Sequence, residues 1–497
     1  SPDDVTFLYL MSALHAATGH FQDAEADVKQ GLSIDPKNIP LMLQSARIEM
    51  NRQHADLGLA SRQLASLLQV DPKNLDAYVM LSDLYSRQGQ VDAAISEMET
   101  ALKLAPLNKP LRLRLAKLYM SNDPPQWSQF DQILEQAQSN SQLSSDPQWY
   151  SLQATGLLKR DQDADAVAKM KQAQSMAPDD LDLERQYIDM LIQAKQYADG
   201  VQEIDRVLAA GKRLWWLHEL RGEALVKQDQ KQQALQEFQT ALALVDADGQ
   251  RDLAADIIST IGSSIDPDTA LSVLQPRIGI DSGWRLLSIR LYEMKQDWAS
   301  ALKVAEQVSA DPLSTTGQKL AATRAIAENA AQLNEFDKAR AAYLSWLDQN
   351  PNDVIALNNL ACLLNDNLNQ PQQALQYSKQ AYTLASQGGE KISPLITDTE
   401  GWVLVRCGGD GAKAGLAMLE QLVTDHGDFL DARYHLAEAY LQAGNIDAAM
   451  TQLSVAQDAI KTQEANHVSV RDQLKKNIDR ALTQAKQAAA KAEAKVQ

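Results

Sequence analysis

The sequence has 497 residues, a formal net charge of −18 and an isoelectric point near 4.9. Such an acidic balance argues against a general binder of nucleic acids or anionic membranes, whose binding surface would be basic. It permits a basic protein partner, although solubility alone accounts for such a charge. Hydrophobic residues make up 45% of the chain, but no run of about twenty apolar residues occurs. We therefore expect a buried core and no membrane-spanning segment.

Residues 76–106 are predicted to form a helical hairpin. Two apolar-periodic runs are joined by a short turn, and Tyr78, Leu81 and Tyr85 share one face of the first run. Pro106 ends the second run, because proline cannot continue a helix. A helix pair this short cannot bury its apolar faces alone, so it requires neighbouring pairs.

The same pattern of aromatic, small and proline residues recurs along the chain. It is strongest over residues 5–106, 147–178, 215–246, 320–386 and 430–460. Weaker copies lie at residues 109–140, 181–212, 249–280, 282–313 and 394–428. In period and pattern the chain resembles the tetratricopeptide repeat (TPR) family, whose unit is a helix–turn–helix of about 34 residues. The resemblance implies an all-α solenoid, a right-handed superhelix of about thirteen units that covers nearly the whole chain.

Two regions depart from the repeat. Asn122-Asp123-Pro124-Pro125 replaces a tight turn, and residues 249–318 keep few consensus residues, which leaves room there for a bend or a non-repeat element. We divide the chain into N-terminal units (1–120), units after an irregular connection (121–248), degenerate helical repeats (249–318), C-terminal units (319–462), and a capping helix with a basic tail (463–497).

The last segment differs from the repeats. Residues 471–497 carry seven Lys and Arg against three Asp and Glu, a balance of +4. An apolar stripe at helical spacing predicts a final helix that caps the array, because a repeat array needs an end unit with a polar outer face. The stripe consists of Leu474, Ile478, Ala481, Leu482 and Ala485. A basic tail that binds a partner is the alternative interpretation.

Several residue groups resemble catalytic or metal sites but fail the corresponding tests. The stretch from Cys407 to Lys413 resembles a phosphate loop, yet no Ser or Thr follows Lys413 and no strand precedes it, so a turn is favoured. Asp161, Asp163 and Asp165 begin like a calcium loop, but the required glycine and closing glutamate are missing, so a helix start is favoured. The seven histidines show neither zinc spacing nor a nucleophile–base pair. We predict no enzyme activity, no cofactor and no metal.

The two cysteines, Cys362 and Cys407, are too few for a disulfide framework, and we expect small buried thiols. This composition suits either the cytoplasm or a bacterial periplasm. The chain starts without Met and without an apolar leader, so we expect a processed protein or a fragment.

The TPR resemblance implies that first helices line a concave groove. Adjacent side chains on a helix diverge by about 100°, so one indole of Trp215-Trp216 is expected to pack between units and the other to face the groove. Packing of both is the alternative. The register places ten candidate partner-binding residues on the inner side of first helices: Trp216, Glu219, Glu223, Arg290, Arg324, Asn358, Asn359, Arg406, Tyr434 and Glu438.

Asn359 occupies the type of position at which peptide-binding TPR proteins hold a ligand backbone. The carboxylate clamp of the family is incomplete here. Arg324 is available, but Glu328 replaces an asparagine and Asp398 stands in the following unit.

We therefore expect a non-catalytic scaffold that binds protein segments in the groove, binds no nucleic acid, and is compatible with homo-oligomers. Residues 397–409 and 429–450 resemble the closing repeats of long bacterial TPR proteins of envelope and exopolysaccharide export systems. That resemblance implies a periplasmic structural component, with the cytoplasm as the alternative. A third possibility is the regulatory region of an enzyme whose catalytic domain lies outside this chain.

Overall fold

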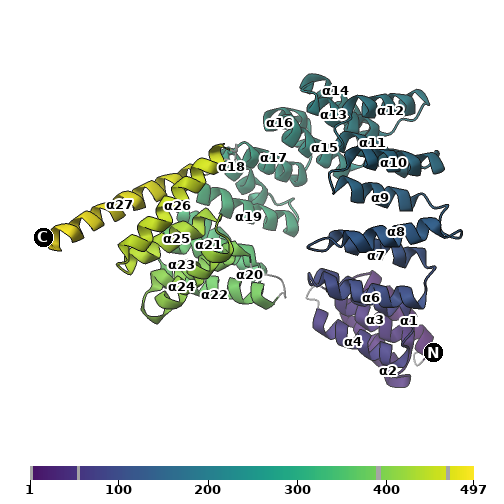
Figure 1. Cartoon of the computed structure of the whole chain (residues 1–497), viewed down its shortest axis with the longest axis horizontal. Helices are drawn as coiled ribbons and strands as arrows, with labels where there is room; N and C mark the ends of the chain where they lie inside the picture. Colours follow the sequence, from purple (N-terminus) through teal and green to yellow (C-terminus); the bar gives the residue numbers. More distant parts are fainter. Residues whose placement is uncertain (1–3, 53–55, 388–392, 466–470, 497) are drawn as a thin grey trace. The chain divides into compact units, whose positions relative to one another are not determined.

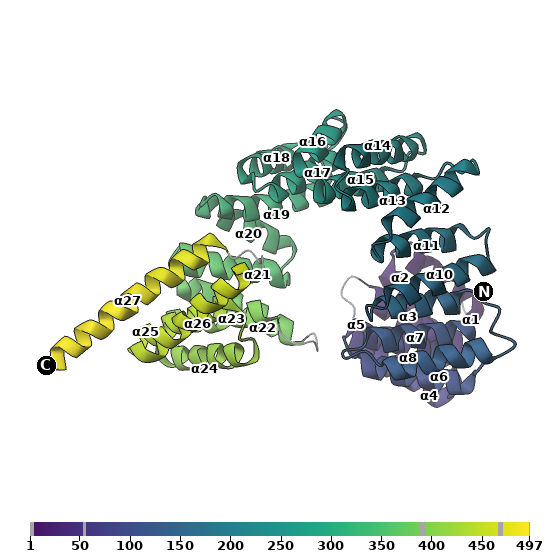
Figure 2. The same cartoon turned by 45° about the horizontal axis from the view of Figure 1, so that its top comes forward.

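The computed structural model describes residues 4–52, 56–387, 393–465 and 471–496. Within these residues the chain forms helices throughout and no strand. It divides into two compact units, an N-terminal unit (Ser1–Asp248) and a C-terminal unit (Gly249–Gln497). In each unit, antiparallel helices are stacked in consecutive pairs (Figures 1 and 2).

The described residues of the N-terminal unit form seven helix pairs. They are α1 (Val5–Ala17) with α2 (Phe21–Ile34), α3 (Ile39–Asn51) with α4 (Leu57–Val70), α5 (Leu75–Arg87) with α6 (Val91–Leu104), α7 (Lys109–Ser121) with α8 (Trp127–Ser139), α9 (Gln148–Leu158) with α10 (Asp163–Met176), α11 (Leu181–Gln193) with α12 (Tyr197–Ala209), and α13 (Trp215–Lys227) with α14 (Lys231–Ala247).

In the C-terminal unit, the part of the chain that the structure describes forms six helix pairs and a final helix. They are α15 (Arg251–Ser264) with α16 (Pro267–Leu274), α17 (Ser282–Met294) with α18 (Trp298–Ala310), α19 (Thr316–Gln332) with α20 (Phe336–Gln349), α21 (Val354–Cys362) with α22 (Pro371–Gln387), α23 (Pro394–Cys407) with α24 (Gly409–Asp425), α25 (Leu430–Gln442) with α26 (Ile446–Ala465), and α27 (Asp472–Val496). A short 3₁₀ helix, η1 (Gln275–Arg277), follows α16, and a π turn, η2 (Leu363–Asn367), follows α21. The prediction of an all-α solenoid of about thirteen helix pairs is confirmed.

The sequence dictates where each pair ends and the next begins. Asn38, Asn74 and Asn108 are the N-caps of α3, α5 and α7, and each lies two residues after a closing proline. Their side-chain oxygens accept the N–H three residues further on, over 3.0–3.2 Å. Such a cap satisfies one of the backbone donors that a helix start leaves unpaired, and it contributes about 1 kcal/mol.

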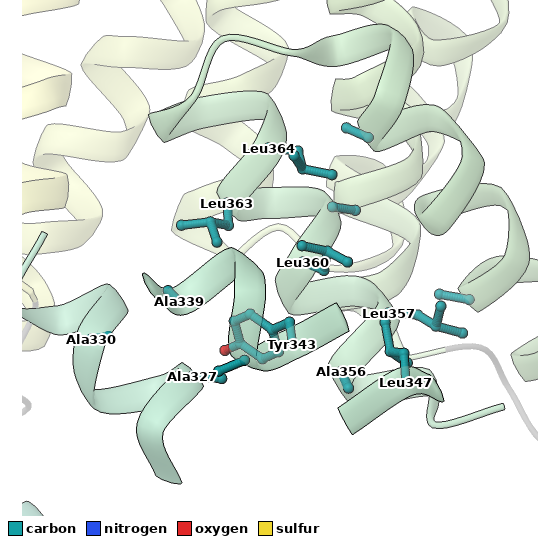
Figure 3. Close-up of a cluster of buried hydrophobic side chains, with 14 of the residues drawn as sticks. Ala327, Ala330, Ala339, Tyr343, Leu347, Ala356, Leu357, Leu360, Leu363 and Leu364 are labelled. Carbon is teal, nitrogen blue, oxygen red and sulfur yellow. The ribbon is translucent and has the colours of Figure 1, made fainter. Parts of the chain in front are cut away.

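Small residues let the two helices of a pair approach closely. Equivalent alanines of the second helices are completely buried: Ala24, Ala60, Ala94, Ala166, Ala234, Ala301, Ala339, Ala374 and Ala449. Figure 3 shows one resulting core, in which Tyr343 of α20 lies near Ala327 of α19 and Leu360 of α21 belongs to the same cluster. Truncating Leu360, which is fully buried, to alanine would cost about 2–5 kcal/mol.

First helices also contact the first helices of neighbouring pairs. Such contacts join α1 to α3, α3 to α5, α7 to α9 and α11 to α13, and in the C-terminal unit α15 to α17, α17 to α19, α21 to α23, α23 to α25 and α25 to α27. Within the described residues no comparable contact joins two second helices. The more closely spaced layer of a curved stack lies on its inside, so we call the first-helix surface of each unit its inner face.

The irregular regions remain helical. Residues 249–318 form two further helix pairs and no inserted non-repeat element within the part described, and their irregularity is the eight-residue α16 followed by η1. In α27 the predicted apolar stripe is buried against α25 and α26, with Ile478 fully covered. This packing confirms the predicted cap. In the part of the chain that the structure describes, no helix is both long and apolar enough to cross a bilayer.

Candidate functional site

A cavity of about 270 Å³ lies on the inner face of the C-terminal unit, between α21, α23, α25 and the start of α27. We call it the C-terminal cavity. Its polar lining includes Asn365, Asp366, Asp398, Thr399, Trp402, Asp431, Tyr434, His435, Arg471 and Asn477. Three carboxylates, a histidine and an arginine from four neighbouring elements therefore converge on one small space.

A buried ion pair forms one wall of this cavity. Nδ1 of His435 in α25 lies 3.0 Å from both carboxylate oxygens of Asp398 in α23, whose side chain is almost completely buried. The imidazole stacks on the indole of Trp402, with ring centroids 5.0 Å apart and planes 8° from parallel. Burial alone lowers the pKa of His435, but the charge of Asp398 and its hydrogen bond outweigh burial and raise that pKa above its ordinary value. The contact with Asp398 thus favours the protonated form of His435, while burial raises the pKa of Asp398 itself above its ordinary value.

A second network begins at the π turn after α21. The N–H of Leu368 donates to the carbonyl of Leu363, five residues earlier, so the last turn of this helix is wider than an α-turn. Asp366 Oδ1 accepts from Trp402 Nε1 over 2.9 Å and from Asn365 Nδ2 over 2.8 Å. These contacts tie the π turn to α23. Asn365 is completely buried, and its Oδ1 receives no hydrogen bond from the described residues.

The final helix supplies the remaining wall. Arg471, just before α27, pairs with Asp431 of α25 through Nη2 and Oδ1. The side chain of Arg471 is 72% exposed and that of Asp431 is 26% exposed, so this pair lies at the rim. Besides capping the array, α27 therefore completes the cavity.

The cavity also contains a thiol beside these groups, but no activated nucleophile among the described residues. Sγ of Cys362 lies 3.3 Å from Thr399 Oγ1, and burial raises the pKa of Cys362 to about 12. A thiol at this pKa stays protonated near neutral pH, whereas a nucleophilic cysteine needs a lowered pKa. No described hydrogen bond joins it to His435. The described residues also hold no group of three or more His, Cys, Asp or Glu that could bind a metal ion.

Comparison with protein-family models identifies the repeats. Four tetratricopeptide repeat models match residues 75–106, 112–255, 342–376 and 409–469, which together make up more than half of the chain. The chain is a tetratricopeptide repeat protein. The repeats of this TPR protein support a role as a protein-interaction scaffold.

Solved structures of other TPR proteins are similar to this chain in fold. A TPR protein from Parabacteroides merdae is 21% identical over 48% of this chain and 91% of its own, with a TM-score of 0.36. Yeast Tom70 is 13% identical over 98% of this chain and 96% of its own, with a TM-score of 0.35. A TPR protein from Thermus thermophilus is 23% identical over 38% of this chain and 100% of its own, with a TM-score of 0.28. No curated protein matches the chain.

Two of the ten predicted partner-binding residues of this TPR protein are buried. Trp216 is 8% exposed and packs in a core with Leu217 and Ile188, and Asn358 is 2% exposed. The expectation that both face the groove is therefore corrected: large or amide side chains at these positions fill the space between neighbouring helices. For Trp216 the packing interpretation holds, and the neighbouring Trp215 is only partly buried.

Other predicted residues lie on or beside the C-terminal cavity. Tyr434 lines it, with its ring 5.4 Å from that of His435, and burial raises its pKa to about 12. Arg406 Nη2 donates to Asn369 Oδ1 over 2.6 Å, and its guanidinium lies 5.6 Å from the Trp402 ring. Glu438 follows Tyr434 by one helical turn.

Two arginines and one asparagine lie on earlier helices of the same unit. Arg290 of α17 is exposed, and Arg324 of α19 is exposed and pairs with Glu328 over 2.9 Å. Asn359 of α21 is partly buried beside Tyr343. None of the three lines the cavity. Their role in partner binding remains a prediction.

In the N-terminal unit the predicted Glu219 and Glu223 lie on the inner side of α13. Arg185 of α11 lies 3.8 Å from Glu219 and places its guanidinium 5.3 Å from the Trp215 ring. Burial and the nearby carboxylates of Glu219 and Asp189 raise the pKa of Glu223 to about 7. These acidic side chains thus repel one another with one arginine close by.

The sequence analysis did not identify the central residues of the cavity. The sequence patterns single out neither Trp402 nor Asp366, and His435 is one of seven histidines that show no zinc spacing. The one available signal was register, because Asp398 and His435 are 37 residues apart, about one repeat, on consecutive first helices.

Proposed function

We propose that this chain is a scaffold that binds segments of partner proteins along its inner face, with the C-terminal cavity as the anchor point. The observation that carries the proposal is the concentration of buried polar groups there. Burying a charged or amide group costs free energy, and packing of repeats does not require it, since most repeat contacts in this chain are apolar. Buried polar groups that converge on a cavity are typical of binding sites.

The mouth of the cavity adds an apolar contact. Leu395 of α23 lines the cavity yet is 51% exposed. This exposed leucine shares the cavity lining with Tyr434 and several charged groups. Such a combination resembles the centre of a protein interface, where a few anchors supply most of the affinity.

Site-specific photo-cross-linking tests this proposal. A photoreactive phenylalanine analogue replaces Leu395, and in a matched variant it replaces Val455 on the second helix α26, which is 43% exposed. In cells of the source organism we expect cross-linked partner bands from position 395 and not from position 455. Equal bands from both positions, or bands from position 455 alone, would contradict binding on the inner face.

We further propose that the scaffold belongs to a bacterial envelope assembly in the periplasm. The sequence resemblance at residues 397–409 and 429–450 motivates this proposal, and the low cysteine content is compatible with it. Fusing alkaline phosphatase, which is active only after export, to the C-terminus of the full gene product tests it. Activity in intact cells is expected, and an inactive but stable fusion would favour the cytoplasm.

A further inference from the structure

We infer that the C-terminal cavity receives a cationic side chain, the guanidinium of an arginine or the ammonium of a lysine, from the bound protein segment. The inference rests on the proposed function and specifies the partner's chemistry. It follows from three independent features of the cavity: its charge, its unused acceptors, and a guanidinium that already lies at its rim.

The lining is negative even when all its bases are protonated. Asp366, Asp398 and Asp431 supply three carboxylates, and only His435 and Arg471 supply positive charge. Asp398 and Asp431 are each paired, so the uncompensated charge lies with Asp366. Opposite charge on a ligand is therefore favoured, and an anionic ligand is disfavoured.

The hydrogen-bonding capacity left over consists of acceptors. Asp366 Oδ1 already accepts from Trp402 and Asn365, whereas no described residue donates to its Oδ2. Asn365 is fully buried with Oδ1 unpaired, and its orientation is fixed because Nδ2 donates to Asp366. A ligand that only donates suits these acceptors, of which Asp366 Oδ2 belongs to an exposed side chain. Arginine offers five N–H donors and lysine three, and neither has an acceptor.

The chain itself provides a model for such a contact. Arg471 lies on the rim, largely exposed, with its guanidinium on Asp431. A carboxylate of this cavity therefore already forms an ion pair with a guanidinium of the chain itself. The exposed carboxylate of Asp366 lies in the same lining. It forms no ion pair with a described residue, although its charge acts on the nearby His435.

The inference is opposite in sign to the carboxylate clamp of the TPR family, which is incomplete in this sequence. A carboxylate clamp needs basic residues in flanking units, and here Asp398 and Asp431 stand on the inner sides of α23 and α25. The partner's positively charged side chain, and not a chain terminus with negative charge, is what this cavity fits.

Selection from a random linear peptide library on the full chain, at physiological salt, tests the inference. Three baits are compared: the wild type, the cavity variant Asp366→Asn with Asp431→Asn, and the control variant Asp337→Asn with Asp458→Asn. The control removes the same charge from second-helix side chains that are 84% and 77% exposed. Thermal unfolding of each bait verifies that it is folded.

We expect wild-type selection to enrich peptides with arginine or lysine at a fixed position. Their affinity should fall about tenfold or more in the cavity variant and stay unchanged in the control variant. Basic peptides that bind all three baits equally would overturn the inference, because the net charge of −18 alone would then attract them. Enriched peptides without basic residues that are lost in the cavity variant would overturn it and leave the proposed function intact. No enrichment on any bait would count against both.

Discussion

Both units carry acidic residues on their inner faces, but the surroundings of these residues differ. In the N-terminal unit, Arg185 lies 3.8 Å from Glu219, and burial together with the charge of Glu219 raises the pKa of Glu223 to about 7. In the C-terminal unit, Asp366 and Asp398 each accept hydrogen bonds from a specific side chain of a neighbouring helix. In the N-terminal unit, burial and repulsion between carboxylates thus outweigh the nearby positive charges at Glu223. In the C-terminal unit, the carboxylates of Asp366 and Asp398 belong to a hydrogen-bonded network.

The comparison shows when a carboxylate on the inner face becomes part of a binding site. A carboxylate on a first helix costs free energy when burial and neighbouring charges oppose ionisation. A carboxylate on the inner face becomes part of a preorganised surface when the first helix of the next repeat places a hydrogen-bond donor within reach of it. In this chain Trp402 and His435 are those donors, and both lie on the last complete pairs of the array.

The largest expected effect comes from breaking the buried ion pair. His435→Phe keeps a ring against Trp402 but leaves Asp398 buried without its cation, so the free energy of unfolding of the C-terminal unit should fall by about 3 kcal/mol. Urea denaturation monitored by circular dichroism measures this free energy. Adding Asp398→Asn should recover part of the loss, since a neutral amide is cheaper to bury. A further loss instead would show that the two residues are not coupled.

A smaller loss of stability is expected on substituting Trp402, and it should exceed the loss on substituting Trp215. Trp402→Phe removes the Nε1 donor to Asp366 and should cost about 1–2 kcal/mol. Trp215→Phe in the N-terminal unit removes no described indole hydrogen bond and should cost less than about 0.5 kcal/mol beyond lost packing area. Equal losses in the same denaturation experiment would mean that the network around Asp366 adds nothing to stability.

The raised pKa of Glu223 in the N-terminal unit predicts that the stability of this unit depends on pH. The folded pKa of Glu223, about 7, lies above its ordinary value of 4.5, so the folded state binds the proton more tightly and loses stability as the pH rises between those values. Glu223→Gln should therefore raise the free energy of unfolding by about 1–2 kcal/mol at pH 8 and change it little near pH 5. Denaturation at both pH values measures this. An equal change in the free energy of unfolding at the two pH values would contradict the view that ionisation of Glu223 destabilises the folded state.

The smallest effect is expected at an exposed pair on the inner face. Arg324→Ala removes an ion pair with Glu328 whose side chains are 46% and 38% exposed, and stability should change by less than about 0.5 kcal/mol. A loss comparable to that of His435→Phe would show that exposure does not separate the two classes of ion pair. Thermal unfolding at low and physiological salt is sufficient to detect such a loss.

The fold was predictable because the repeat reuses the same local chemistry. Buried alanines, closing prolines and asparagine N-caps recur with the period of the helix pairs, and each acts within a few residues of its own position. The weaker copies were harder to recognise because their turns use other residues. Lys195 and Gln296 adopt the left-handed conformation, φ +61° and +59°, that glycine provides at Gly89. Tertiary packing outweighs the local preference there.

The cavity was not predictable from one sequence, because its residues come from four elements and no motif links them. The π turn that carries Asn365 and Asp366 has no sequence signature within a normal helical pattern. Register alone placed Trp216 and Asn358 on the inner side, but it could not show that neighbouring helices cover them. Side-chain contacts between repeats decide exposure, and the sequence does not specify them.

The central claim is that the C-terminal cavity binds a cationic side chain, and the fluorine resonance of Trp402 tests it most directly. The full chain is labelled with fluorotryptophan, and Trp402→Phe identifies the resonance. Titration with N-acetyl-arginine methylamide should shift this resonance saturably, while the uncharged, nearly isosteric N-acetyl-citrulline methylamide should not. Equal shifts with both compounds, or a Trp402 resonance that moves with neither, would contradict the account.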